Sequence, residues 1–155
     1  MNSRQERLSA IKRIIETKDI STQEELMAEL EKLGYDVTQA TVSRDISDLG
    51  LLKARISMVN TVSTSRQIYS LPEVERLRSL LNEFMTSVDR ADNLIVIRTN
   101  PGTAQAVAAA IDSIKWIGVL GTVGGDDTIL VITRSEDAGS RIAERLTKLR
   151  EERAV

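Results

Sequence analysis

The hydrophobic period of the chain changes within its first seventy residues, and this change restricts the fold more than any other feature. Up to Gly50, apolar residues recur every three or four positions in three short segments, which is the spacing of amphipathic helices. Beyond Gly50 they alternate at every second position, as in strands. The expected elements are helices at residues 5–17, 23–33 and 39–49 and strands at 51–56 and 66–71. Three helices followed by a hairpin is the order of a winged helix-turn-helix domain.

Capping residues support these boundaries. Ser21 and Glu24 have the spacing of a capping box, in which a hydroxyl and a carboxylate satisfy free amides at a helix start. Gly34 suits the left-handed position that ends a helix, and Thr38 is the expected N-cap of the third helix. A polar connection, residues 57–65, separates the two strands.

The third helix presents hydrogen-bonding side chains opposite its apolar stripe of Val42, Ile46 and Leu49. In a helix-turn-helix motif, such a helix enters the DNA major groove. Arginine can donate two hydrogen bonds to guanine, glutamine can pair with adenine, and hydroxyls can bond phosphates. The expected DNA contacts are Gln39, Thr41, Ser43 and Arg44 on the helix, with Lys53, Arg55 and Arg66 on the hairpin.

Charge alone does not decide whether this half binds DNA. The whole chain has a formal net charge of -2, and acidic and basic residues are balanced over residues 1–71. The acids, however, are concentrated on the second helix, away from the third helix and the hairpin. This segregation favours DNA binding, and a surface helix of a protein-interaction domain remains the alternative.

Pro72 marks the candidate domain boundary. The pattern beyond it predicts a short helix and then the order ββαββα, with Pro101 to Thr103 opening the middle helix and the last helix starting near Asp137. One strand is expected at residues 116–123, between these two helices. This order indicates a four-stranded antiparallel sheet covered on one side by two helices, and hence an α+β chain. The expected division is residues 1–71, a linker helix at 72–82, and a second domain at 83–155.

Two glycines and two aspartates, Gly124 to Asp127, stand directly before an apolar strand. A rigid carboxylate pair suits a guanidinium, which forms bidentate hydrogen bonds, and glycine lets a ligand approach the backbone. Gln105 and Asp112 are seven residues apart and point the same way from one helix. Backbone groups near Thr122 and Gly124 could hold the amino-acid end of such a ligand. An ordinary acidic turn and a magnesium site at Asp112, Asp126 and Asp127 are the alternatives.

Composition narrows the functional classes. The chain has no cysteine and no histidine, which excludes thiolate nucleophiles, Ser-His pairs and the commonest zinc ligands. No stretch approaches the roughly 18 apolar residues of a membrane span, so a cytoplasmic protein with no membrane partner is expected. Aromatic residues are only 3% of the chain, and two small aliphatic cores favour an assembly of several copies.

Three stretches together resemble the bacterial arginine repressors: VTQATVSRDISDLGLLK, PGTAQAVAAAID and GTVGGDDTILVI. The resemblance covers nearly the whole chain, with the motifs in the same order and at similar separation. It implies a transcriptional regulator, not an enzyme, with an N-terminal winged helix-turn-helix domain and a C-terminal domain that forms trimers and hexamers. L-arginine would be the effector, with no cofactor or metal, and operators of arginine biosynthetic and catabolic genes would be the DNA partner.

The resemblance also assigns residues. It implies that Ser43 and Arg44 are the main DNA contacts and that Asp126 and Asp127 bind L-arginine between subunits. The rest of the implied arginine pocket is Gln105, Asp112, Thr122 and Gly124.

Overall fold

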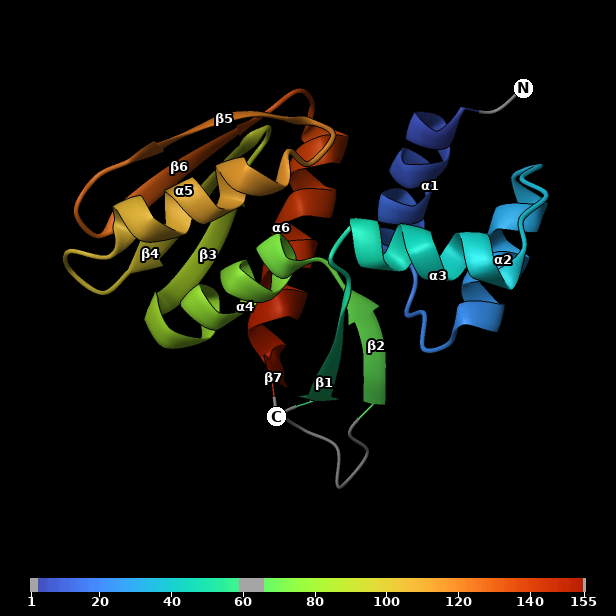
Figure 1. Ribbon diagram of the computed structural model, residues 1–155. Helices are drawn as coiled ribbons and strands as arrows, with labels where there is room; N and C mark the ends of the chain where they lie inside the picture. The colour runs from blue at the N-terminus through green and yellow to red at the C-terminus, as the bar shows by residue number, and fades with distance from the viewer. Residues whose placement is uncertain (1–2, 59–65, 155) are drawn as a thin grey trace. The chain divides into compact units, whose positions relative to one another are not determined.

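The computed structural model describes residues 3–58 and 66–154, which fall into two compact units (Figure 1). One unit contains residues 3–57 and 66–72, and the other contains residues 73–154. Most of the polar connection expected at 57–65, namely residues 59–65, lies outside the described residues. In the described part of the chain, no helix is both long and apolar enough to cross a bilayer.

The first unit contains three helices and a hairpin, as the change of hydrophobic period predicts. Its helices are α1 (Arg4–Thr17), α2 (Gln23–Lys32) and α3 (Gln39–Asp48), and its strands are β1 (Leu52–Met58) and β2 (Arg66–Ser70). The strands pair antiparallel, with Leu52 opposite Ser70. One aliphatic cluster holds the helices together, and its fully buried members are Ile11, Leu26, Leu30 and Val42. The winged helix-turn-helix prediction is confirmed.

The capping box at the start of α2 lies one residue later than the sequence pattern predicts. Thr22, not Ser21, is the N-cap, and its hydroxyl accepts a hydrogen bond from the amide of Glu25 at 3.1 Å. The Glu25 carboxylate, not that of Glu24, accepts from the amides of Ser21 at 2.6 Å and Thr22 at 3.4 Å. The later register lets one carboxylate satisfy two free amides. The spacing of Leu26, Leu30 and Leu33 predicts one core face for this helix, but α2 stops at Lys32, and Leu33 is 54% exposed while the other two are fully buried.

The second unit has the predicted order of helices and strands. It consists of α4 (Pro72–Phe84), β3 (Met85–Ala91), β4 (Leu94–Thr99), α5 (Ala104–Ile114), β5 (Val119–Gly124), β6 (Thr128–Thr133), α6 (Glu136–Glu151) and β7 (Glu152–Ala154). Strands β3 to β6 form an antiparallel sheet in the order β3-β4-β6-β5. The α+β prediction is confirmed, while the short strand β7 was not expected.

Burial alternates along β4 and β6, because α5 and α6 cover one face of this sheet. Helix α5 packs on β5 and β6, and α6 packs on β3, β4 and β6 (Figure 1). The covered face carries the fully buried Ile95, Ile97, Ile129 and Val131. The opposite face carries the half-buried Leu94, Val96, Leu130 and Ile132, with Val123 62% exposed beside them. We call these five residues the open apolar face.

The strand expected to start at Trp116 begins at Val119 instead. Lys115 and Gly118 both have left-handed backbone angles, φ 57° and φ 96°, which turn the chain between α5 and β5. The turn buries Trp116 under Arg145, whose guanidinium carbon is 5.2 Å from the ring centroid. It also leaves Ile117 78% exposed.

Gly139 allows α6 to approach the β3–β4 hairpin and β6 closely. A Cβ added at Gly139 would lie 2.8 Å from the backbone oxygen of Asp92 and 3.1 Å from the hydroxyl oxygen of Thr133. Both neighbours are fixed, since the Asp92 oxygen is backbone and the fully buried Thr133 donates to the carbonyl of Asn93 at 2.7 Å. Glycine is therefore required here for packing.

We predict that Gly139→Ala destabilises the protein by about 1–3 kcal/mol through overpacking. In an open helix the same change would stabilise by up to about 1 kcal/mol, because alanine has the higher helix propensity. Thermal unfolding measures the difference. Gly121→Ala is the control, because apart from Gly121 and its two chain neighbours no heavy atom of the described residues lies within 4 Å of the added methyl carbon. A gain in stability for Gly139→Ala would contradict the packing argument.

Candidate functional site

Helix α3 holds its polar residues outward from a capped N-terminus. The Thr38 hydroxyl accepts from the amide of Thr41 at 3.3 Å, so the predicted N-cap is confirmed. The first turn contains no acidic residue. Gln39, Ser43 and Arg44 are exposed and Thr41 is half-buried, while Val42 on the inner side is fully buried. The helix therefore presents to solvent the four side chains predicted to meet DNA.

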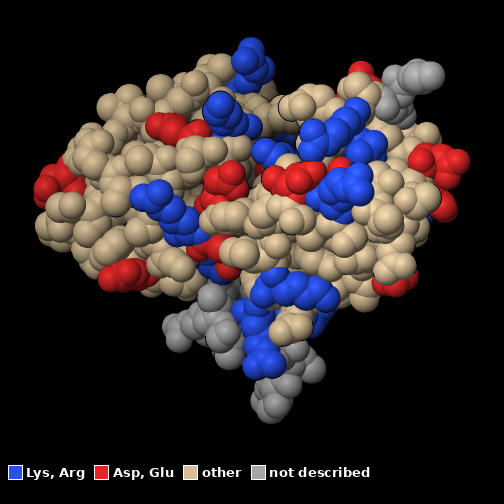
Figure 2. Space-filling view, in the orientation of Figure 1, with Lys and Arg blue, Asp and Glu red and all other residues tan. Residues whose placement is uncertain are grey.

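The hairpin adds cations to the same unit. Lys53 and Arg55 are two residues apart on β1 and therefore share one face of the hairpin, and both are exposed. The Lys53 ammonium lies 5.0 Å from the ring centroid of Tyr69, its cross-strand partner, so a cation–π contact orients it. Arg66 on β2 reaches Asp19 at 3.5 Å. Figure 2 shows Lys and Arg side chains gathered over β1 and β2.

One residue of α3 departs from the predicted pattern. Asp45, next to Arg44, is only 1% exposed. In the sequence this aspartate lies beside the apolar stripe of α3 and has no basic residue at helical spacing that would pair with it. Arg7 of α1 donates two hydrogen bonds to its carboxylate, from Nε at 2.5 Å and from Nη2 at 3.1 Å. The hydrogen bond with Asp45 raises the pKa of Arg7 above its ordinary value, so the guanidinium stays charged. The two partners are 38 residues apart, and no local pattern indicates such a pair.

In the second unit, main-chain hydrogen bonds fix the loop that carries the two aspartates. The carbonyl of Asp126 accepts from the amides of Gly102 at 3.0 Å and Ala104 at 3.2 Å, at the start of α5. The carbonyl of Asp127 accepts from the amide of Thr99 at 2.8 Å, at the end of β4. Both aspartate side chains remain exposed. The backbone is thus held by its neighbours while both carboxylates face solvent.

Helix α5 and strand β5 are joined by two polar contacts that involve all four of the other predicted ligand residues. Gln105 donates from Nε2 to the carbonyl of Gly124 at 2.6 Å, and Thr122 donates to the Asp112 carboxylate at 2.9 Å. A Cβ at Gly124 would lie 3.2 Å from Oε1 of Gln105, so glycine allows the carboxamide to lie against the strand. The prediction that Gln105 and Asp112 point the same way is confirmed.

The structure adds two residues to this group that the sequence reasoning missed. Thr128 donates from its hydroxyl to Oδ1 of Asp127 at 2.9 Å, and Arg98 donates to that hydroxyl oxygen at 2.6 Å. Arg98 and Thr128 are cross-strand partners on β4 and β6, a relation that only the register reveals. They restrain one of the two exposed carboxylates from the strand side.

A divalent cation is the alternative ligand for these carboxylates. Among the residues that the structure describes, no three His, Cys, Asp or Glu side chains are grouped closely enough to hold a metal ion. The set of Asp112, Asp126 and Asp127 is therefore not a preformed magnesium site in one chain. An exposed, cationic group with several hydrogen-bond donors fits the two loop carboxylates better.

Comparison with known proteins identifies both units. Residues 2–77 match the family model described as arginine repressor, DNA binding domain, and residues 81–148 match arginine repressor, C-terminal domain. The arginine repressor of Thermoanaerobacter sp. is 48% identical over 149 residues, which cover 92% of this chain and 96% of that protein. The arginine repressor of Caldicellulosiruptor saccharolyticus is 46% identical over 144 residues, covering 91% and 93%. The chain therefore belongs to the arginine repressor family.

Proposed function

We propose that the protein is an L-arginine-dependent repressor of arginine biosynthesis and catabolism genes, with L-arginine as co-repressor. The observation that carries this proposal is the loop of Asp126 and Asp127, whose backbone is fixed by three hydrogen bonds while both carboxylates stay exposed. A guanidinium is planar and always charged, and two carboxylates can accept its donors pairwise. The family name of the relatives agrees with this ligand.

The proposed pocket separates the two ends of the ligand. Asp126 and Asp127 would accept from the guanidinium, while Thr122 and the backbone near Gly124 would hold the α-amino and carboxylate groups. Gln105 and Asp112 already bond to β5 within one chain. They therefore align the strand, and their remaining donors and acceptors stay available to the ligand or to a second chain.

The pocket is open in a single chain, and we propose that self-assembly completes it. The open apolar face of the sheet exposes apolar side chains, and Val123 is the most exposed of its five residues. Exposed apolar patches of this kind commonly mark protein association surfaces. We propose a trimer built on this face and a hexamer of two trimers, with L-arginine between subunits. Arginine would neutralise acidic loops that otherwise repel one another when packed together.

In the first unit we propose α3 as the DNA-reading helix. Arg44 and Gln39 would contact base edges, Ser43 and Thr41 would contact phosphates or bases near them, and Lys53 and Arg55 of the hairpin would contact the backbone. The exposure of these side chains and the absence of acids in the first turn of α3 support this assignment.

The ligand assignment predicts a selective thermal shift. L-arginine at about one hundred times its dissociation constant should add roughly 2.7 kcal/mol to stability, whereas L-lysine, L-citrulline and magnesium at the same concentration should not. Asp127→Asn should abolish the shift. Asp92→Asn is the matched control, since Asp92 is an exposed aspartate of the same unit. Its backbone is left-handed, a conformation that asparagine tolerates. A full arginine response in Asp127→Asn, or a shift with citrulline or magnesium instead, would refute the guanidinium assignment.

The DNA assignment predicts two kinds of loss. Arg44→Ala should lower affinity for the operator by about 1–3 kcal/mol and relax its specificity, because a base contact is lost. Lys53→Ala should weaken operator and unrelated DNA alike and reduce the salt slope by about 1, because a phosphate contact is lost. Both variants should keep the thermal shift with L-arginine. DNA binding that is insensitive to salt would instead favour a protein-interaction role for this unit.

The assembly predicts that charge on the open apolar face dissociates the protein. Val123→Lys should reduce the mass measured by sedimentation velocity, because a buried ammonium without a partner is costly. Leu33→Lys is the control, since Leu33 is similarly exposed, at 54%, but belongs to the other unit. An unchanged mass for Val123→Lys would place the interface elsewhere.

A further inference from the structure

Helix α3 has little apolar surface with which to fix its own rotation. Its buried residues are Val42, which is fully buried, and Asp45, which is 1% exposed; Ile46 and Leu49 are only half-buried. Ile46 and Leu49 pack against the same core cluster as Val42. Apolar contacts are not directional, so these few contacts do little to oppose a small rotation of the helix about its axis. The carboxylate of Asp45 is the directional contact on this face.

The planar guanidinium of Arg7 makes that directional contact with Asp45. Its Nε and Nη2 donate to the two different oxygens of Asp45, at 2.5 and 3.1 Å, and the side chains are 17% and 2% exposed. A bidentate pair constrains both distance and plane, which a lysine ammonium would not. Because Asp45 directly follows Arg44, the pair acts on the turn of α3 that carries the exposed base-reading candidates.

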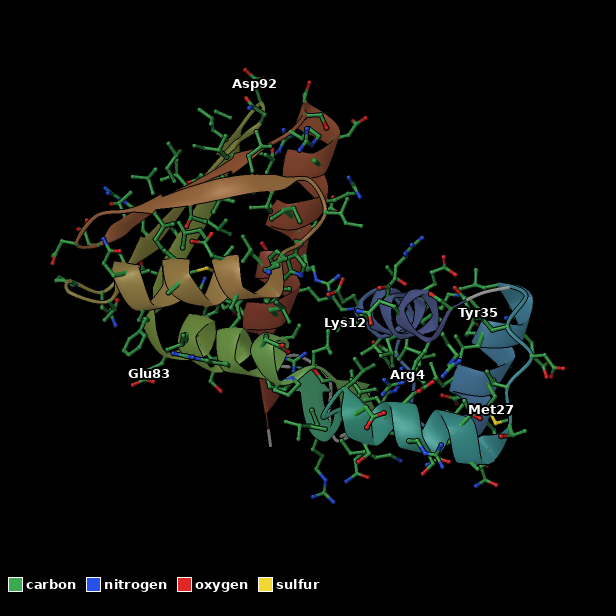
Figure 3. All side chains as sticks on the ribbon, turned by 45° about the horizontal axis from the view of Figure 1, so that its top comes forward. Arg4, Lys12, Met27, Tyr35, Glu83 and Asp92 are labelled. Atoms are coloured by element: carbon green, nitrogen blue, oxygen red, sulfur yellow. The ribbon has the colours of Figure 1, made fainter. Side chains whose placement is uncertain are left out.

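A second ion pair joins the turn before Arg7 on α1 to the turn after Asp45 on α3. Arg4 donates from Nη2 to Oδ2 of Asp48 at 2.6 Å, and Figure 3 shows Arg4 between α1 and α3. The earlier arginine pairs with the later aspartate, so two ion pairs link successive turns of α1 to successive turns of α3. This outer pair is exposed, at 62% and 37%, and solvent screens it. The inner pair is the dominant constraint, and the outer one limits sliding along the axis.

We propose that Arg7, with Arg4 in a lesser role, is a positioning residue for operator recognition that holds α3 in the rotation at which Ser43 and Arg44 meet the DNA. Side chains end roughly 5–6 Å from a helix axis, so a rotation of about 20° moves their ends by roughly 2 Å. Such a displacement breaks a bidentate base contact, whose hydrogen bonds tolerate only a few tenths of an ångström. Phosphate contacts tolerate it better, since flexible side chains can follow. The proposal rests on the DNA-reading role proposed above for α3.

The test measures specificity in addition to stability. The intact chain with saturating L-arginine would be assayed on two duplexes: the one it selects most tightly from a random-sequence pool, and a scrambled version of equal length. Each variant would be studied at a temperature where its unfolding curve shows it folded. Arg7→Lys, which keeps the charge but loses the fork, and Asp45→Asn should each lower the ratio of the two affinities about tenfold. Affinity for the scrambled duplex should change by no more than about twofold.

Two further variants make the result decisive. Arg13→Gln removes an exposed arginine from the same helix and should leave the ratio unchanged. Arg4→Gln breaks only the exposed pair and should fold normally, with a smaller fall in the ratio, so the proposal stays testable even if Arg7 variants do not fold.

The outcomes separate this proposal from the one on which it rests. An unchanged ratio in the Arg7 and Arg4 variants, together with reduced stability, would make the pairs structural braces only. Equal losses on both duplexes would mean that the variants weaken DNA binding as a whole, without a separate effect on base reading, and would overturn the positioning role. If Arg44→Ala also leaves the ratio unchanged, the reading role of α3 fails as well; if Arg44→Ala lowers it while Arg7→Lys does not, only the positioning role fails.

Discussion

The backbone bonds of Asp126 and Asp127 are the constraint on which the second unit depends. Their carbonyls accept from the amides of Thr99, Gly102 and Ala104, and so tie the β5–β6 loop to the end of β4 and the start of α5. The amide of Ala104, the first residue of α5, has no partner within the helix, so the loop also caps the start of α5. The Thr103 side chain does not cap the helix and instead bonds to the carbonyl of Asn100 at 2.6 Å. One set of hydrogen bonds thereby ends a strand and starts a helix, while the carboxylates of Asp126 and Asp127 stay exposed.

In both units, the groups that hold the candidate site in place are different from the groups that face solvent. In the loop, main-chain atoms anchor and side chains of the same residues face solvent. In α3, different side chains have the two roles: Val42 and Asp45 are buried and anchor the helix, while Ser43 and Arg44 are exposed to solvent. The inner aspartate requires a partner, since a buried carboxylate without one is strongly unfavourable. Arg7 is that partner, and its two hydrogen bonds also orient α3, which non-directional contacts in the small aliphatic core cannot do.

Local patterns in the sequence predict the elements, and most of their failures arise where a contact between distant residues sets the structure. The order of helices and strands, the Thr38 cap and the burial of Val42 follow from spacing alone. The cap of α2 shifts from Ser21 to Thr22 because Glu25 can serve two amides at once, and the start of β5 shifts because Trp116 is buried under Arg145. The Arg7–Asp45 pair and the Arg98–Thr128–Asp127 chain join residues from different elements. Only tertiary register brings them together, so no window of sequence could reveal them.

The exposure of Asp126 and Asp127 determines how the proposed effector would act on the proposed assembly. On an isolated chain, water screens the two carboxylates, and charges about 6 Å apart repel by less than about 1 kcal/mol. When acidic loops of several chains pack together, the effective dielectric constant falls and the same repulsion becomes several times larger. In the proposed assembly, a guanidinium would therefore gain little on one chain and much at the junction of several. This difference in affinity between the separate and the assembled states is what linkage requires of an effector, and it follows from carboxylates that the fold holds rigidly but does not itself neutralise.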